Sequence, residues 1–162
     1  MRNKMATEIF RIEGLEELES KLSSLMALGK ADAVARQTLV KAAKGAMEPV
    51  YNEVLTTVPI GTKPRDERNP FHMKDTVSIT ARIPTENDRQ STMVNQTDAA
   101  IAIVSVKKSA VSLAQEFGTS KIPAQSFLRP ALTKHREDIV TLFKADLADY
   151  IREVAAKQAR RK

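Results

Sequence analysis

The sequence predicts an α+β protein in which a small antiparallel β-sheet packs against two N-terminal helices and one long C-terminal helix. Three observations support this class. Apolar residues recur at helical spacing over residues 15–26 and 32–58, alternate over residues 76–84, and recur at helical spacing again over residues 132–154. The elements are therefore expected in the order strand, helix, helix, two or three strands, helix.

The N-terminal segment is predicted to supply the first strand and the first helix. Residues 5–13 alternate weakly between apolar and polar side chains, which indicates a strand. A helix is expected between Gly14 and Gly29, because acidic residues in its first turns suit the helix dipole and its apolar side chains form one stripe. The stripe consists of Leu15, Leu18, Leu22, Leu25 and Met26.

A second helix is predicted from Asp32, a suitable N-terminal cap, toward Val58. Pro49 lacks the backbone donor that a helix interior needs, so a kink or break is expected over residues 45–49. One stretch of this helix is rich in small residues that would let another element approach closely, either within the core or from a neighbouring subunit. These residues are Ala42, Ala43, Gly45 and Ala46.

Two strands are predicted in the middle of the chain, each preceded by a polar loop. Residues 59–72 contain three prolines and several charges, and residues 84–98 are a long polar connection. Residues 76–84 form the clearest strand, with Val77, Ile79, Ala81 and Ile83 on one face. Residues 99–108 supply a partner that is apolar on both faces, as a central strand would be.

Residues 109–116 are predicted to form one or two helical turns, with Val111, Leu113 and Ala114 facing inward. Gly118 suits a left-handed cap at the end of these turns. Residues 119–126 have no periodicity, and Pro123 favours an extended backbone there. This stretch is expected to be a joint between the sheet and the last helix.

The last helix is expected to begin near Pro130, whose missing N–H costs nothing in a first turn. Phe127 and Leu128 are predicted to anchor it in the core. Arg129 precedes a proline, and its guanidinium is expected to turn toward Glu116. The apolar face of this helix comprises Leu132, Ile139, Phe143, Leu147, Tyr150, Ile151 and Val154.

The net charge of +6 is concentrated at the two ends of the chain. Residues 157–162 carry four positive charges and residues 1–4 carry two, so the rest is neutral overall. We therefore divide the chain into one α+β domain over residues 1–156 and a basic C-terminal tail over residues 157–162. The tail is interpreted as a solvated terminus, and the alternative is an arm that contacts nucleic-acid phosphates.

The residues that support chemistry are sparse, so an enzyme is not predicted. The chain has no cysteine, its five glycines are too far apart for a phosphate-binding loop, and no serine is accompanied by a marked base. His72 and His135 have no second histidine at metal-binding spacing. No cofactor and no metal are expected. The longest apolar run has six residues, so no membrane contact is expected either.

The stretch "EFGTSKIPAQSFLRPAL" resembles the signature of the tail-completion, or head–tail joining, proteins of long-tailed bacteriophages. The first part of that signature is matched by Glu116, Phe117, Gly118 and Thr119, and the second part by Phe127, Leu128, Arg129, Pro130, Ala131 and Leu132. The segments "GLEELESKL" and "MKDTVSI" are weaker similarities in the same order. In departures from the family pattern, Ser126 replaces a usual proline, Leu113 replaces a common tyrosine, and residues 63–72 resemble an insertion.

The resemblance implies a structural protein of the virion neck, made in the host cytoplasm, which joins a DNA-filled head to a tail. It implies a homo-oligomeric ring, six-fold by expectation, around DNA that is held without sequence specificity. The neighbours would be the head connector or stopper on one side and the tail terminator or tube on the other. The alternatives are a tail terminator or head-stopper ring protein, a nucleic-acid-binding module that uses the basic termini, and an uncharacterised hydrolase.

Overall fold

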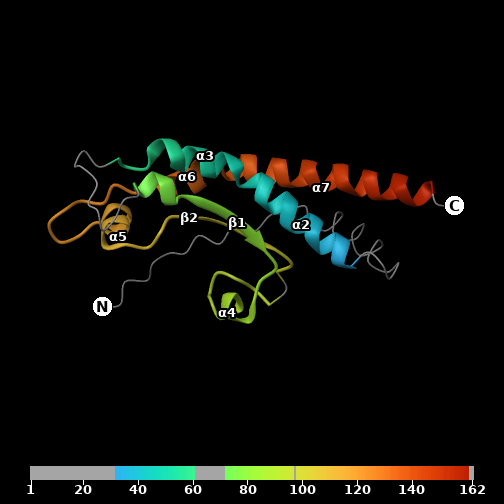
Figure 1. The fold of residues 1–162 in the computed structure, drawn as a ribbon, viewed down its shortest axis with the longest axis horizontal. Helices are drawn as coiled ribbons and strands as arrows, with labels where there is room; N and C mark the ends of the chain where they lie inside the picture. The colour runs from blue at the N-terminus through green and yellow to red at the C-terminus, as the bar shows by residue number, and fades with distance from the viewer. Residues whose placement is uncertain (1–31, 61–71, 97, 161–162) are drawn as a thin grey trace.

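The computed structural model describes residues 32–60, 72–96 and 98–160. The first strand and first helix predicted from the sequence lie outside these residues. Figure 1 shows that α2, α3, α6 and α7 form a helical layer along one side of the molecule. The strands β1 and β2 lie beside this layer, while α4 and α5 lie apart from each other (Figure 1). The described residues thus form the α+β fold that the sequence predicts.

The predicted break in the second helix is confirmed. Helix α2 (Asp32–Ala46) ends before Met47, and α3 (Glu48–Thr57) starts directly after it. Pro49 lies in the first turn of α3, where no intrahelical acceptor is available for its missing N–H. One proline therefore divides a 27-residue periodic segment (residues 32–58) into two helices.

The small residues of α2 pack against helix α7 (Arg136–Ala159). Ala42 and Ala46 are buried, as is Leu147 of α7. A Cβ atom on Gly45 would lie 2.8 Å from Asp146 Oδ2, so the two helices approach closely at this glycine. This face is therefore part of the intramolecular core, which was the first of the two interpretations drawn from the sequence.

A second part of the core joins α3, Val77 and the helix α6 (Leu128–Lys134). It is an apolar cluster that the sequence predicted in its main residues, with partly buried side chains such as Leu128 and Ile139 around it. The buried members are Val50, Val54, Val58, Val77, Phe127 and Ala131. Phe127 is thus a core anchor, as predicted.

The sheet consists of β1 (Ser78–Arg82) and β2 (Ile101–Ser105), which pair antiparallel from Ser78↔Ser105 to Arg82↔Ile101. Alternate residues of β1 are exposed and half-buried, which confirms the predicted period of two. Ile83 departs from the prediction because the strand ends at Arg82, one residue before it, and its side chain is exposed. Within the described residues β2 pairs with β1 alone, so the central position predicted for it is not seen there.

The predicted long polar connection between the strands contains a short helix, α4 (Glu86–Arg89). Thr85 caps this helix, and Asp88 accepts hydrogen bonds from the Thr85 backbone and from the Arg82 guanidinium. The Arg89 guanidinium donates to the carbonyls of Asn95, Gln96 and Asp98. Side chains inside the connection therefore hold it in a defined shape.

The predicted last helix is divided into α6 and α7, which meet at His135. Leu132, expected on the apolar face, is exposed, because α6 turns Ala131 toward the core instead. Helix α7 continues to Ala159, three residues into the predicted basic tail. Among the described residues no helix is long and apolar enough to cross a membrane.

Candidate functional site

Glu116 is only 4% exposed, and its carboxylate lies between two helices. Glu116 belongs to α5 (Ala110–Phe117), whereas the groups it binds belong to the start of α6. Its Oε2 accepts from the backbone N–H groups of Phe127 (2.9 Å) and Leu128 (3.1 Å). Its Oε1 accepts from the backbone N–H of Arg129 (3.3 Å). We call this arrangement the Glu116 cap.

The Glu116 cap satisfies backbone donors that α6 cannot satisfy itself. The first N–H groups of any helix lack an intrahelical acceptor, and Phe127, in the N-cap position, makes no side-chain cap bond. A carboxylate at this position forms charge-assisted hydrogen bonds, which are stronger than neutral ones. The acceptor therefore comes from a different helix, 11–13 residues earlier in the chain.

The predicted approach of Arg129 to Glu116 is confirmed, with Arg129 Nε 3.6 Å from Glu116 Oε1. This ion pair is longer than the backbone hydrogen bonds to the same carboxylate. The Arg129 guanidinium also lies over the Phe117 ring, 5.1 Å from its centroid, in cation–π geometry. Arg129 thus covers the outer side of the Glu116 cap and links it to an exposed aromatic ring.

Gly118 ends α5 with a backbone that requires glycine, although not in the predicted way. Its φ of 75° is positive as expected, but its ψ of 177° is extended and differs from that of a left-handed helical cap. A Cβ atom there would lie 2.8 Å from the Ala124 backbone nitrogen. The chain therefore turns away from the helix with an extended residue packed against the returning loop.

The loop after Gly118 is compact despite its lack of periodicity. Thr119 N donates to the Ile122 carbonyl (2.8 Å), and Thr119 Oγ1 accepts from the Ile122 N–H (3.0 Å). The Gln125 N–H returns to the Gln115 carbonyl (2.7 Å). Ser126 Oγ donates to the Glu116 carbonyl (2.6 Å). The loop is thus hydrogen-bonded to the end of α5.

The ten residues of the predicted motif divide into an inner and an outer set. The inner set supports the Glu116 cap or the core and consists of Glu116, Gly118, Phe127, Leu128 and Ala131. The outer set lies at the surface and consists of Phe117, Thr119, Arg129, Pro130 and Leu132. Two segments that are separate in the sequence therefore form one structural unit.

Helix α5 has its polar side chains inside and its apolar side chains outside, so the predicted inward orientation of Val111 and Leu113 is wrong. Ser112 and Glu116 are buried, whereas Val111 is 62% exposed, Leu113 42% and Phe117 56%. The inner positions are taken by hydrogen-bonding groups: Ser112 Oγ donates to the Lys107 carbonyl (3.0 Å), and Glu116 caps α6.

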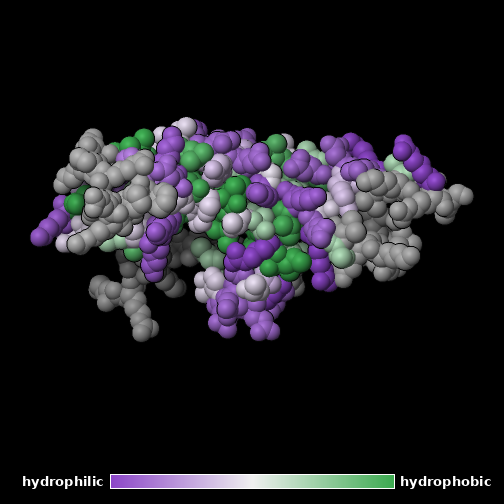
Figure 2. Space-filling model, viewed as in Figure 1, coloured by the Kyte–Doolittle hydropathy of each residue, from purple (hydrophilic) through white to green (hydrophobic). Residues whose placement is uncertain are grey.

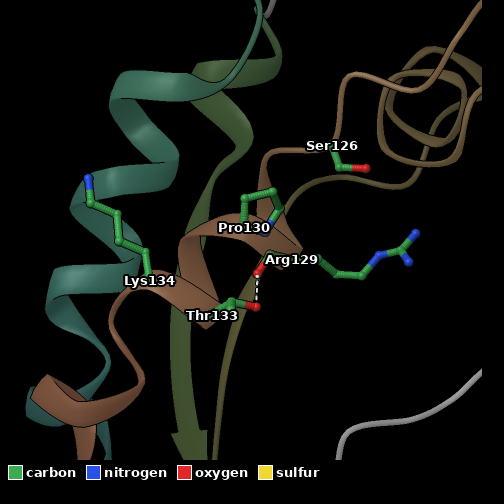
Figure 3. Close-up of a pocket in the computed structure, with 5 residues that line it drawn as sticks. All are labelled: Ser126, Arg129, Pro130, Thr133 and Lys134. Carbon is green, nitrogen blue, oxygen red and sulfur yellow. Dashed lines mark hydrogen bonds between the residues drawn. The ribbon is translucent and has the colours of Figure 1, made fainter.

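A shallow hollow beside the motif is lined by Ser126, Arg129, Pro130, Thr133 and Lys134. Figure 3 shows that the Arg129 and Lys134 side chains point away from each other on opposite sides of this hollow. Thr133 Oγ1 donates to the carbonyl of Arg129 in the preceding turn (3.0 Å). The polar groups do not converge on a common point, as those of a small-ligand site would.

A charged cluster joins α3 to the junction of α6 and α7. Lys134 Nζ donates to Glu53 Oε1 (2.9 Å), and this hydrogen bond lowers the pKa of the Glu53 carboxyl. His135 lies between Glu53 (Nε2 to Oε2, 3.6 Å) and Asp138 (Nδ1 to Oδ2, 2.9 Å). Among the described residues no group of histidine and acidic side chains is arranged to hold a metal ion.

No protein-family model, curated protein or solved structure matches the chain.

Proposed function

We propose that this chain is a structural protein of the neck of a long-tailed bacteriophage, where it acts as a ring-forming tail-completion protein. The proposal is supported by one observation above all. The two halves of the motif that resembles the tail-completion signature meet in the Glu116 cap, where Glu116 of the first half binds the backbone of Phe127, Leu128 and Arg129 of the second.

This contact explains why the two halves of the motif occur together in the sequence: each half supplies part of one structural unit. The glutamate fixes the start of α6, the glycine lets the chain turn back, and the phenylalanine seats α6 in the core. Each of these three residue types is therefore needed for the shape of the unit: the cap of α6, the turn after α5 or the packing of α6 in the core. Such a unit holds two helices at a constant angle, as a subunit that must fit rigid neighbours requires.

The buried carboxylate favours a structural role over hydrolysis. Glu116 accepts three backbone hydrogen bonds and faces a guanidinium, so its lone pairs are engaged. The pair formed by His135 and Asp138 has a carboxylate, Glu53, at the other imidazole nitrogen. A nucleophile–base arrangement would place a hydroxyl or thiol there instead.

In the proposed neck the chain would contact copies of itself, a head connector or stopper, and a tail terminator or tube protein. DNA would pass through the ring without sequence-specific contacts. A tail terminator or a head stopper is the alternative within the same class, and the motif favours the completion protein.

The genetic test uses the phage that encodes this chain. Deletion of the gene should give filled heads and finished tails that remain unjoined in electron micrographs. Supply of the wild-type chain, or of the Arg129→Gln variant, should restore infectious particles, whereas Glu116→Ala should restore few. Fully infectious virions without the gene would contradict the proposal, and so would a virion reconstruction that places the chain away from the neck.

The nucleic-acid-binding alternative has a separate test with purified protein. If the basic termini bind phosphates, duplex binding should weaken steeply with salt, because each neutralised phosphate releases counterions. Ending the chain at Ala156 should then abolish binding. Binding that is absent, or that does not change with salt, would remove this alternative.

A further inference from the structure

The outer side of α5 presents an unusual amount of apolar surface. Leu113 and Phe117 are one helical turn apart on the same exposed side of α5, whereas Val111, two residues before Leu113, is exposed on the other flank of the helix. Ile122, at the C-terminal end of the helix, is also exposed. We call the three apolar side chains Leu113, Phe117 and Ile122 the α5 face. Apolar patches of this kind mark contact surfaces more often than single exposed side chains do.

The surroundings of the α5 face are basic. Lys107, Lys108, Lys121 and Arg129 are all exposed within residues 106–130. The single acidic residue of that segment, Glu116, is buried in the cap described above. A partner for this surface should therefore combine apolar side chains with negative charge.

The connection between β1 and β2 has that combination. It leaves the sheet at the Arg82↔Ile101 end, whereas α5 follows the Ser78↔Ser105 end. Met93 is 60% exposed there and Ile83 43%. Together with the exposed Glu86 of α4, Met93 and Ile83 make up what we call the α4 face.

The α4 face has a small negative charge and a defined shape. Residues 82–98 contain three acidic and two basic residues, a net charge of −1: Arg82 is paired with Asp88, and the Arg89 guanidinium is bound to carbonyls of the same connection. Figure 2 shows hydrophilic side chains over α4 at the bottom of this view and hydrophobic ones next to them over the middle of the molecule. Helices α4 and α5 lie in different parts of the molecule, α4 below the sheet and α5 at the left in Figure 1.

We propose that the α5 face of one copy binds the α4 face of a second copy, in a head-to-tail contact. The two surfaces match in apolar character and are opposite in charge, and they belong to different parts of the fold. A contact between two different patches repeats from copy to copy and closes into a ring when the rotation between neighbours fits. The inference deepens the proposed function and depends on its homo-oligomeric part.

Site-directed cross-linking tests this contact in the full chain, which has no cysteine of its own. The exposed positions Leu113→Cys and Met93→Cys are introduced into separate proteins, which are mixed at high concentration with a short bismaleimide. We expect a 93–113 cross-linked dimer from the mixture, identified by mass spectrometry. Leu142→Cys, on the exposed side of α7, replaces Leu113→Cys in the matched control mixture and should give little product.

Charge variants then examine the pairing of the two surfaces. Lys107→Glu combined with Lys108→Glu should lower the yield of the 93–113 product roughly tenfold, because like charges would now face each other. Glu86→Lys in the partner should restore most of it. If these substitutions leave the yield of the 93–113 product unchanged, the proposed pairing is wrong.

Three further outcomes would overturn the proposal. Dimers formed by Leu113→Cys alone would indicate that two α5 faces meet, and a mixture without the 93–113 product would show that the faces do not meet at all. If the thiol of Phe117→Cys reacts slowly at every protein concentration, another part of the same chain covers the α5 face, and the contact between copies is ruled out. Labelling that slows only as concentration rises supports the contact. A ring built through other surfaces would leave the proposed neck function standing.

Discussion

The substitution Glu116→Gln isolates the charge of the Glu116 cap with almost no change in volume. The remaining carbonyl oxygen can still accept from Phe127 and Leu128, whereas the new amide NH2 would face the N–H of Arg129. One hydrogen bond is lost and two lose their charge assistance. Since a hydrogen bond to a charged group contributes about 1.5–3 kcal/mol, we expect the free energy of unfolding to fall by about 2 kcal/mol.

Urea unfolding followed by circular dichroism measures this loss. The midpoint should decrease while the slope m stays constant, which assigns the change to stability rather than to the unfolded state. For a chain of this size, a loss of about 2 kcal/mol corresponds to a fall in Tm of roughly 4–8 °C. Glu116→Ala should cost more, since it leaves all three backbone donors without their acceptor.

Arg129→Gln is the matched control, because it removes the ion pair and keeps the backbone N–H. The Arg129 side chain is 66% exposed and its Nε lies 3.6 Å from the carboxylate, so we expect a loss below about 1 kcal/mol. The reasoning is refuted if Arg129→Gln costs as much as Glu116→Gln, since the ion pair would then dominate. An unchanged midpoint for Glu116→Gln would refute it as well.

The remaining predictions concern the turn, the core and the α4 connection. Gly118→Ala should cost about 1–3 kcal/mol in thermal unfolding, since its positive φ and the 2.8 Å approach to a backbone nitrogen both oppose a Cβ atom. Gly45→Ala, which meets only the movable end of an exposed Asp146 side chain, should change stability by less than about 1 kcal/mol, and a larger loss there would mean that the α2–α7 contact is rigid. Phe127→Ala should cost about 3–5 kcal/mol, and a variant that melts like the wild type would show that this ring is not a core anchor. The hydrogen bond from Arg82 lowers the pKa of the Asp88 carboxyl below its ordinary 3.8, so Asp88 stabilises the fold fully above pH 3.8 and loses this effect as the pH falls through the lowered value. Asp88→Asn should therefore reduce Tm at neutral pH and weaken its acid dependence, and equal acid dependence in both proteins would contradict this.

The features that could be predicted from the sequence are those set by one residue or by a short pattern of residues. Pro49 located the break between α2 and α3, because the missing donor acts wherever the proline stands. The alternation of residues 76–84 gave β1 and its inner face. The small residues of α2 predicted a close approach, and Gly45 lies against α7 as expected.

The orientation of α5 could not be predicted in the same way. Periodicity shows that a helix has an apolar side, but the assignment of that side to the interior is only a statistical rule. Here Ser112 bonds to the Lys107 carbonyl five residues earlier, and Glu116 bonds to backbone N–H groups 11–13 residues later; these hydrogen bonds make the polar side the inner one. The partners of Glu116 come near only where the chain turns back after Gly118, and the periodicity of residues 109–116 does not contain that turn.

The boundary between α6 and α7 was missed for a related reason. Residues 133–138 contain neither proline nor glycine, so nothing in them signals a break. The charged cluster of Lys134, His135, Glu53 and Asp138 forms at this point through contacts with α3. Tertiary contacts accompany the break, and a one-dimensional pattern does not contain them.

The short sequence distance across the Glu116 cap has a consequence for the order of folding. Its donors and acceptor are separated by only 11–13 residues, so closing that loop costs little chain entropy, whereas α2 and α7 must meet across most of the described chain. We expect the cap to be formed in the folding transition state. Glu116→Gln should then slow refolding more than it speeds unfolding.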